Sequence, residues 1–495
     1  MNAAGRGQRE VMTFLERSAD KRIDTHAASV FLEPERVLKI KRAVKFPFLD
    51  YSTLEKRRAA CEAEIAVNRP FAGAVYRRAV AITRRPGGGL AVGGDGEPVE
   101  WAVEMRRFDE AQTLDHLAER RGIDASLADA LGYAVARAHE AAPVAANFDF
   151  AGALNRVVAQ NDTELRGFPD LFTREAVGTL TDATRAALDR VRGLLGARGR
   201  AGLVRRCHGD LHLGNIVLID GAPVLFDAIE FDPAFATGDV FYDLAFLLMD
   251  LIERGLNAAA NIVLNRYLNE TGRADNYDAL AALPLFLSVR AAIRAKLAAV
   301  RNDTDEAQSY FTLAQRLIAP PPARLVAVGG LSGTGKSVLA RGLAPMLLPE
   351  PGAVWLRSDV ERKRRMGVAE TDRLPAEAYS IEVTARVYAG LADKARRVLA
   401  AGHSAMVDAV FARPEERTAI ENAAAGRPFQ GLFLTADLTT RVARVGTRER
   451  DVSDADASVA RAQEQYDLGG IGWHRVDATG TPQETLRRAH EVLGA

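Results

Sequence analysis

One glycine-rich octet restricts the fold of this chain more than any other feature. Residues 330–337 read Gly-Leu-Ser-Gly-Thr-Gly-Lys-Ser, directly after the apolar run Leu-Val-Ala-Val at 325–328. Such a loop closes around phosphate when a buried strand enters it and a helix leaves it. The residues that follow the octet continue as Val-Leu-Ala, which suits a helix. The sequence therefore predicts an α/β fold with a parallel sheet for the last part of the chain.

The octet also predicts a nucleotide site. Lys336 would bridge the β- and γ-phosphate oxygens of ATP, and the Ser337 hydroxyl would coordinate Mg²⁺. The remaining loop residues would bring backbone N–H groups close to the phosphates; they are Gly330, Ser332, Gly333, Thr334 and Gly335. A glycine-rich turn without a ligand is the alternative, and the strand–loop–helix context disfavours it.

Acidic and basic residues downstream could complete this site. Asp359 follows the apolar run 354–357 and could accept the proton of a substrate hydroxyl. Asp408 ends the run 405–407 and suits a metal or substrate role. Arg448 and Arg450 lie in a charged segment that resembles the mobile lid of small P-loop kinases, in which arginines neutralise charge on the transferring phosphoryl group; surface charge is the alternative.

A second polar constellation lies far upstream. His208-Gly209-Asp210 leads through Asn215 into two short apolar runs, and the second run ends at Asp227. If the chain doubles back as a hairpin, these side chains converge. Asp210 would then orient the attacking hydroxyl, while Asn215 and Asp227 would hold Mg²⁺ on the nucleotide.

The N-terminal region offers a cation for the same nucleotide. Residues 29–32 and 37–41 alternate as a β-hairpin, which places Lys39 and Lys41 on one face. Residues 53–69 form a helical pattern that carries Glu62 and Glu64. A strand lysine paired with a helix glutamate can hold the α- and β-phosphates. Either lysine with either glutamate would serve, and solvated surface charge is the alternative.

These upstream features resemble the protein-kinase-like phosphotransferases, and the His-Gly-Asp-x-His-x-x-Asn pattern most resembles their aminoglycoside and choline kinase branch. The resemblance implies a bilobal α+β domain. It also implies that Glu104 and Met105 lie at the hinge that contacts adenine, and that Asp239 or Asp243 braces the catalytic loop. The glycine-rich phosphate lid of protein kinases is missing from the sequence.

Three consecutive prolines mark a boundary at 319–323, because they cannot continue a helix. We therefore expect a kinase-like domain at 1–318 and a P-loop domain at 324–495. The second domain resembles the P-loop group that includes gluconate kinases, polynucleotide 5′-kinases and zeta-type toxins. Nearly the whole chain resembles bacterial proteins that fuse an aminoglycoside-phosphotransferase-like domain to a P-loop kinase domain.

The leading hypothesis is a kinase with two ATP·Mg²⁺ sites that phosphorylates a hydroxyl of a small molecule, such as a sugar or sugar-like alcohol. One alternative is a catalytic P-loop domain regulated by a kinase-like sensor lobe. A third is phosphorylation of nucleic-acid 5′-hydroxyls, helped by the basic residues Arg357, Arg362, Lys363, Arg364 and Arg365.

The overall composition weighs against some of these partners. The 65 basic and 65 acidic residues balance, so no global field attracts nucleic acid or anionic lipid. The sequence has two cysteines and begins without a signal-peptide pattern, and its apolar runs are too short to span a membrane. We expect a cytoplasmic protein.

Overall fold

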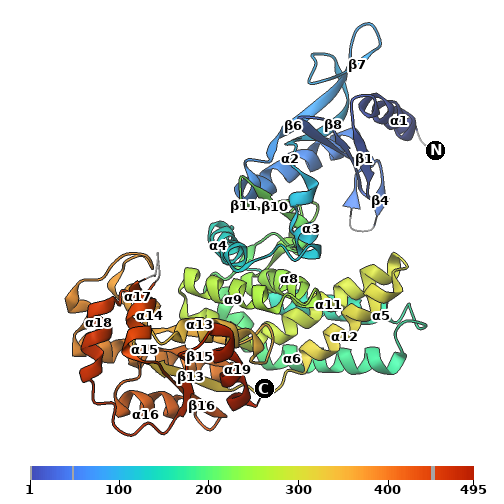
Figure 1. Ribbon diagram of the computed structural model, residues 1–495. Helices are drawn as coiled ribbons and strands as arrows, with labels where there is room; N and C mark the ends of the chain where they lie inside the picture. The colour runs from blue at the N-terminus through green and yellow to red at the C-terminus, as the bar shows by residue number, and fades with distance from the viewer. Residues whose placement is uncertain (1–2, 47–48, 447–451, 495) are drawn as a thin grey trace. The chain divides into compact units, whose positions relative to one another are not determined.

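The computed structural model describes residues 3–46, 49–446 and 452–494 (Figure 1). The chain divides into two compact units, which we describe separately. Unit 1 comprises residues 1–160 and 195–250, and unit 2 comprises 161–194 and 251–495. Three helices have residues in both units: α5 (Phe150–Leu165), α6 (Arg174–Arg200) and α8 (Val240–Glu253).

Unit 1 begins with a six-stranded antiparallel sheet of order β1-β2-β3-β8-β6-β7. Its strands are β1 (Lys21–Asp24), β2 (Ala28–Leu32), β3 (Arg36–Lys41), β6 (Tyr76–Arg84), β7 (Leu90–Val92) and β8 (Glu97–Arg106). Helices α1 (Ala3–Glu16) and α2 (Leu54–Ala72) pack on this sheet (Figure 1). The β2–β3 hairpin and the α2 helix confirm the expected elements, and the Thr53 side chain caps α2.

The rest of unit 1 consists of helices and short strand pairs. The hairpin β10–β11 carries the predicted catalytic stretch, and β9 pairs with β12 next to it. The elements are β4 (Lys45–Phe46), β5 (Leu49–Asp50), α3 (Leu114–Glu119), α4 (Ala125–Ala141), β9 (Val204–Arg206), β10 (Ile216–Ile219), β11 (Ala222–Leu225), α7 (Pro233–Ala236) and β12 (Thr237–Asp239).

Unit 2 contains a helical part and an α/β part. The helices before the proline run are α9 (Asn257–Thr271), α10 (Ala274–Asp278), α11 (Leu283–Val300) and α12 (Thr304–Ile318). Among them α11 and α12 pack closely against each other. Short 3₁₀ turns join several elements of the two units: η1 (Glu110–Gln112), η2 (Leu213–Asn215), η3 (Ala279–Ala282), η4 (Ala344–Met346), η5 (Ala376–Tyr379) and η6 (Gln463–Gln465).

The α/β part is built on a five-stranded parallel sheet of order β14-β15-β13-β16-β17. Its strands are β13 (Leu325–Gly330), β14 (Val354–Arg357), β15 (Ala405–Asp408), β16 (Phe429–Thr435) and β17 (His474–Asp477). Its helices are α13 (Lys336–Leu343), α14 (Ser358–Met366), α15 (Ile381–Ala400), α16 (Pro414–Ala423), α17 (Leu438–Gly446), α18 (Ala457–Ala462) and α19 (Pro482–Leu493). This arrangement is the predicted parallel α/β sheet.

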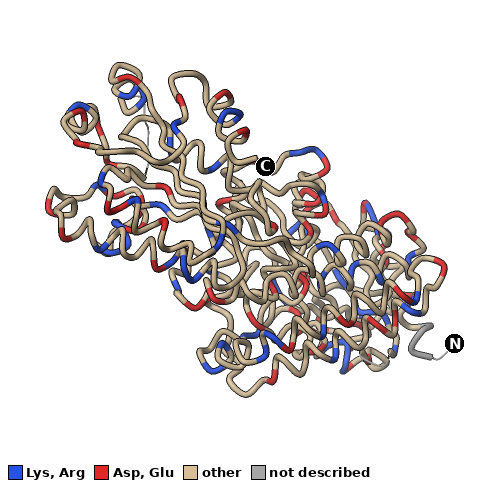
Figure 2. The backbone as a smooth tube through the Cα atoms, turned by 90° about the horizontal axis from the view of Figure 1, so that it is seen from below, with Lys and Arg blue, Asp and Glu red and all other residues tan. Residues whose placement is uncertain are grey.

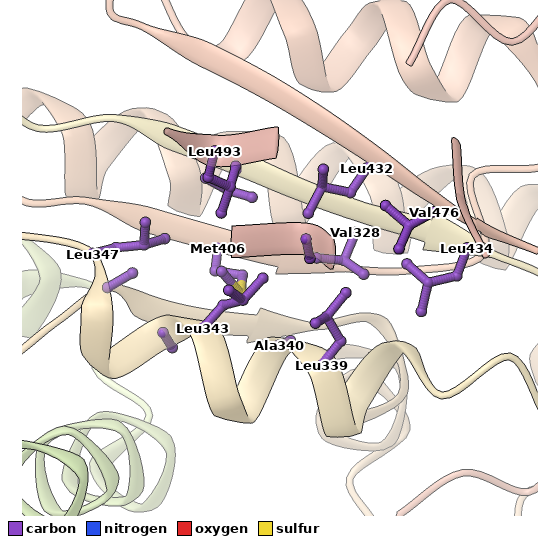
Figure 3. Close-up of a cluster of buried hydrophobic side chains, with 14 of the residues drawn as sticks. Val328, Leu339, Ala340, Leu343, Leu347, Met406, Leu432, Leu434, Val476 and Leu493 are labelled. Carbon is purple, nitrogen blue, oxygen red and sulfur yellow. The ribbon is translucent and has the colours of Figure 1, made fainter. Parts of the chain in front are cut away.

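One hydrophobic core lies between this sheet and helices α13 and α19 (Figure 3). Val328, Met406 and Leu432 come from three neighbouring strands, while Leu343 and Leu493 come from the two helices. Because β13 is central and buried at every residue, the loop that follows it starts from a fixed point.

The indole ring of Trp473 packs against glycines of two neighbouring strands of this sheet. A Cβ atom added to Gly431 of β16 would lie 2.3 Å from the ring of Trp473, and one added to Gly329 of β13 would lie 3.1 Å from it. The ring also makes an edge contact with Phe411, at 5.0 Å between centroids. The two glycines therefore leave the room that Trp473 fills.

Charge is spread evenly over the molecule. Figure 2 shows basic and acidic residues interspersed along the tube, in agreement with the balanced composition. Among the described residues, the helices are all too short or too polar to cross a membrane.

Candidate active sites

Two lysines of β3 meet one glutamate of α2 in unit 1. Lys39 Nζ lies 2.9 Å from Glu64 Oε1 and 2.5 Å from Asp227 Oδ1. Lys41 Nζ lies 2.5 Å from Glu64 Oε2 and also pairs with Glu230. Glu64 is fully buried, whereas Glu62, the other candidate, is exposed and pairs with Arg58. The glutamate of the predicted pair is thus Glu64.

The two lysines differ in their second partner. Lys39 reaches the candidate metal ligand Asp227, while Lys41 is held deeper by Glu230, which also accepts a 3.0 Å hydrogen bond from the Tyr51 hydroxyl. Burial opposes the charge on Lys39, but its ion pairs with Asp227 and Glu64 outweigh this and raise its pKa well above the usual value. Lys39 is therefore the lysine that lies beside Asp227, the candidate metal ligand.

The catalytic stretch folds back on itself as expected. The Asn215 side-chain amide donates to the Asp210 carbonyl at 2.9 Å and to its carboxylate at 3.1 Å. His208 lies within 2.8 Å of the Phe226 carbonyl through Nε2, which therefore donates, and this bond ties the loop to the strand before Asp227. Asp227 has φ +61°, a left-handed conformation that turns its carboxylate back toward Lys39. The structure thus forms two groups, Lys39 with Glu64 and Asp227, and Asp210 with Asn215. They are joined through the backbone, where the Phe226 N–H donates to the Asn215 carbonyl at 2.9 Å.

A buried carboxylate at the start of α8 braces this loop. Asp243 accepts hydrogen bonds from the backbone N–H of Gly209 at 2.8 Å and of His208 at 3.3 Å. It also lies 3.1 Å from His139 Nε2. Asp239, the other candidate, instead forms a buried ion pair with Arg198 at 2.7 Å. Asp243 is therefore the brace.

The two hinge candidates lie inside a strand. Glu104 and Met105 are inside β8, where both pair with β3 on one side and β6 on the other. Their backbone groups are thus committed to the sheet, and the Glu104 carboxylate pairs with Arg78 at 2.9 Å. The connection begins only after Arg106. A contact of Glu104 or Met105 with adenine stays a prediction.

An apolar cluster near the end of β8 could receive the adenine base of a nucleotide. Met105 is buried there together with Val217 of β10, and Ile23, Phe108 and Phe226 pack against the cluster while remaining partly exposed. Partly exposed apolar side chains from both the sheet and the catalytic hairpin are the usual surroundings of a bound heterocycle.

The glycine-rich loop of unit 2 has the conformation its sequence predicts. Gly330, Gly333 and Gly335 have φ values of +135°, +87° and +91°, which L-residues rarely adopt. The Ser337 hydroxyl donates to Asp408 Oδ2 at 2.6 Å, so the two predicted metal ligands are adjacent. Lys336 Nζ lies 3.2 Å from the Leu331 carbonyl at the mouth of the loop.

A cavity of about 890 Å³ opens in front of this loop. Lys336, Ser337 and Asp408 line it together with Asp359, the predicted base. Burial and, next, the nearby Asp408 carboxylate raise the pKa of Asp359. Arg448 and Arg450 lie outside the described residues.

Three residues in or beside this cavity were not predicted as parts of the nucleotide site. Gln463 Oε1 accepts a 2.6 Å hydrogen bond from the Ser332 backbone N–H in the loop. Arg357 lies 3.4 Å from the Ser337 hydroxyl through Nη2. Arg362, one helical turn after Asp359, is buried and lines the same cavity. No sequence pattern marks a single glutamine as a site residue. Arg362 could have been predicted, because it follows Asp359 by three residues and therefore lies on the same side of the helix.

Comparison with known proteins agrees with this arrangement. A model described as "Phosphotransferase enzyme family" matches residues 54–283, and one described as "AAA domain" matches residues 325–467. The Mycobacterium tuberculosis protein "Uncharacterized protein Rv2004c" is 30% identical over 490 residues, which cover 95% of this chain and 94% of that protein. A Mycobacterium bovis relative, "Uncharacterized protein Mb2027c", matches equally.

This chain belongs to the same family as these two mycobacterial proteins. Its two halves are a phosphotransferase domain of the aminoglycoside phosphotransferase type and a P-loop domain, which confirms the predicted fold class, and the protein is a phosphotransferase of the kinase type. Solved structures similar in part include choline kinase from Cryptosporidium parvum, at 12% identity and TM-score 0.40 over 63% of this chain and 95% of that one. A gluconokinase from Sinorhizobium meliloti matches at 20% identity and TM-score 0.26 over 35% and 92%.

Proposed function

We propose that this phosphotransferase has two ATP·Mg²⁺ sites, one in each unit, and that each transfers the γ-phosphate to a hydroxyl of a small molecule. One observation carries the proposal: each unit gathers a cation for phosphate, a pair of oxygen ligands for a metal and a further carboxylate for the acceptor. Two complete sets on unrelated folds favour two catalysts over a catalyst with a passive sensor lobe.

In unit 1, Lys39 binds phosphate oxygens and Glu64 holds its ammonium group in place. The Asp210 carboxylate takes the proton of the acceptor hydroxyl as its oxygen attacks phosphorus. Asn215 and Asp227 supply the amide and carboxylate oxygens that Mg²⁺ prefers. Bound Mg²⁺ would neutralise charge on the phosphates, and Asp243 keeps Asp210 in register by holding the backbone of the preceding two residues.

In unit 2, backbone N–H groups of the glycine-rich loop and Lys336 bind the phosphates of ATP. Ser337 and Asp408 offer adjacent oxygens for Mg²⁺. Asp359, which lines the same cavity, accepts the proton of the acceptor hydroxyl. Because burial raises its pKa, it is a stronger base once ionised than an ordinary aspartate.

The basic run considered for nucleic-acid binding is only partly accessible, because Arg364 and Arg365 are exposed while two of its other cations are buried. Lys363 is 1% exposed and pairs with Asp454 at 3.2 Å, and Arg362 is 6% exposed. Phosphate contacts along a nucleic acid require accessible cations. The arrangement therefore favours a small-molecule acceptor.

The test measures ADP formation by the full chain and by Asp210→Asn, Asp359→Asn and Lys336→Ala variants with sugars, aminoglycosides and 5′-hydroxyl oligonucleotides. We expect Asp210→Asn to remove one acceptor-dependent activity and the other two variants to remove a second one. Full activity in both aspartate variants would refute the proposed roles. Loss of every activity in the unit 2 variants alone would make unit 1 the sensor.

A further inference from the structure

The strand that leads to Asp359 lies at the edge of its sheet. β14 pairs with β15 on one side only, from Val354 to Arg357. An edge strand exposes unpaired backbone N–H and C=O groups on its outer side, and buried groups of this kind need partners. In this strand the outward groups include the Ala353 carbonyl and the Trp355 N–H.

Two asparagines of α9 supply those partners. Asn265 Oδ1 accepts a hydrogen bond from the Trp355 N–H at 2.6 Å, and Asn265 Nδ2 donates to the Ala353 carbonyl at 3.2 Å. Asn261 Nδ2 donates to the same carbonyl at 3.0 Å. A side-chain amide that both donates and accepts in this way replaces the peptide group of a missing neighbouring strand. Both asparagines are buried, at 3% and 7% exposure.

The two asparagines are also tied to each other. Asn265 Nδ2 lies 3.0 Å from the Asn261 carbonyl and 3.2 Å from its side-chain oxygen. The position is close-packed, because a Cβ atom added to Gly352 would lie 2.8 Å from Asn261 Nδ2. The pair is therefore a fixed clamp, which we name the asparagine clamp, rather than two independent polar contacts.

Further contacts fix the same helices against the α/β part of unit 2. Arg397 of α15 pairs with Asp278 of α10 at 3.1 Å. Lys394 of α15 lies 5.7 Å above the ring of the buried Tyr277. Arg266 of α9 pairs with Glu370 at 3.5 Å. The proline run at 320–322 is thus a boundary in sequence, while α9 and α10 belong structurally with the P-loop sheet.

The clamped strand ends at one residue of the proposed unit 2 site and leads directly to a second. Arg357, its last residue, reaches Ser337. Asp359 follows two residues later, in the first turn of α14. By contrast, the glycine-rich loop leaves β13 in the centre of the sheet, which has strands on both sides. A change at the edge strand therefore displaces the acceptor base relative to the phosphates, while the phosphate loop itself stays in place.

We propose that Asn265, assisted by Asn261, is a positioning residue of the P-loop site: a helix from within the phosphotransferase-family region sets the place of the strand that carries the acceptor base. This inference rests on the proposed function of Asp359. It makes α9, a helix that precedes the proline run, a structural part of the second catalytic site.

The experiment uses the full chain with Asp210→Asn, so that the unit 1 site is silent. It compares Asn265→Ala, the milder Asn261→Ala and a control, Asn276→Ala, which removes another buried amide of the same helical part that bonds to Thr271. Amide exchange is measured in the ADP·Mg²⁺ complex. Loss of one buried hydrogen bond should make the Trp355 amide exchange about tenfold faster in Asn265→Ala. The amides of the glycine-rich loop should keep their rates.

The kinetic readout is the release of phosphate from ATP·Mg²⁺ with water as acceptor, over a range of pH. We expect kcat to fall roughly ten- to a hundredfold in Asn265→Ala, since small displacements of a reacting group have effects of this size. The KM for ATP should stay within about twofold, because uniform nucleotide binding is retained. Asn261→Ala, which keeps the Trp355 bond, should show a smaller fall with the same KM.

The proposal fails if Trp355 exchange is unchanged in Asn265→Ala, or if Asn276→Ala lowers kcat equally. A rise in the KM for ATP with kcat unchanged would also overturn it. Failure of the proposed function looks different: Lys336→Ala and Asp359→Asn would then leave turnover intact, whatever the exchange of the Trp355 amide shows. The exchange readout stands independently of any acceptor.

Discussion

Replacing Asp243 by alanine should release the catalytic loop of unit 1 without touching any group in the reaction. The carboxylate is 2% exposed and accepts from two backbone N–H groups, those of His208 and Gly209, and it faces His139. The alanine side chain has no hydrogen-bond acceptor for these N–H groups, and the buried position is poorly accessible to water. Each buried donor without a partner costs about 1–3 kcal/mol, so the two backbone groups alone amount to about 2–6 kcal/mol.

Hydrogen exchange on peptides that cover His208 and Gly209 measures this loss directly, since their opening free energy should fall by the same amount. Transfer that depends on Asp210 should drop at the same time, while transfer that depends on Asp359 continues. Asp95→Ala, at an exposed position of the same unit, is the control and should change stability by less than about 0.5 kcal/mol. Unchanged protection at His208 and Gly209 in Asp243→Ala would refute the assignment of Asp243 as the brace.

Three further predictions concern charge. Lys39→Met should abolish nucleotide-dependent transfer in unit 1, which a nucleotide titration measures. Lys41→Met should mainly lower the melting temperature of unit 1 in calorimetry, because it leaves Glu230 buried without its cation. Because the folded pKa of Asp359 is raised, its contribution to stability is present below the unfolded value and is lost as pH rises through the folded pKa. Asp359→Asn should therefore be the more stable protein above that pH, while wild-type turnover rises there; equal stability at all pH values would contradict this. Burial lowers the pKa of His403 to about 4, so about 3 kcal/mol of stability should be lost as pH falls from about 6.5 to 4, and His403→Gln should flatten that loss in acid melts.

Sequence alone predicted which residues of each candidate loop lie together, because these residues are close in the chain. The glycine-rich loop is eight residues long, and its strand, loop and helix follow one another, so spacing determines geometry. Asp210, Asn215 and Asp227 are likewise joined by one hairpin. The parallel sheet followed from the same motif, because a phosphate loop needs a buried strand before it.

Choices between equivalent partners could not be made from spacing. Lys39 and Lys41 alternate identically, and only the third dimension shows that Asp227 lies beside the first, 188 residues away. The same holds for Asp239 and Asp243, which are four residues apart but contact Arg198 and the catalytic loop respectively. The end of β8 was equally hard to predict, because the length of this strand depends on its neighbours β3 and β6, which its own residues do not reveal.

The indole of Trp473 has a consequence for how this family can diverge. Its ring occupies the space above Gly329 and Gly431, two residues from strands that are neighbours in the sheet but about a hundred positions apart in the chain. A side chain at 431 and a large aromatic at 473 exclude each other sterically. Relatives that carry alanine or a larger residue at 431 should therefore carry a small residue at 473, so the two positions should covary. Whichever of the two positions mutates first, the protein with that single mutation should be destabilised.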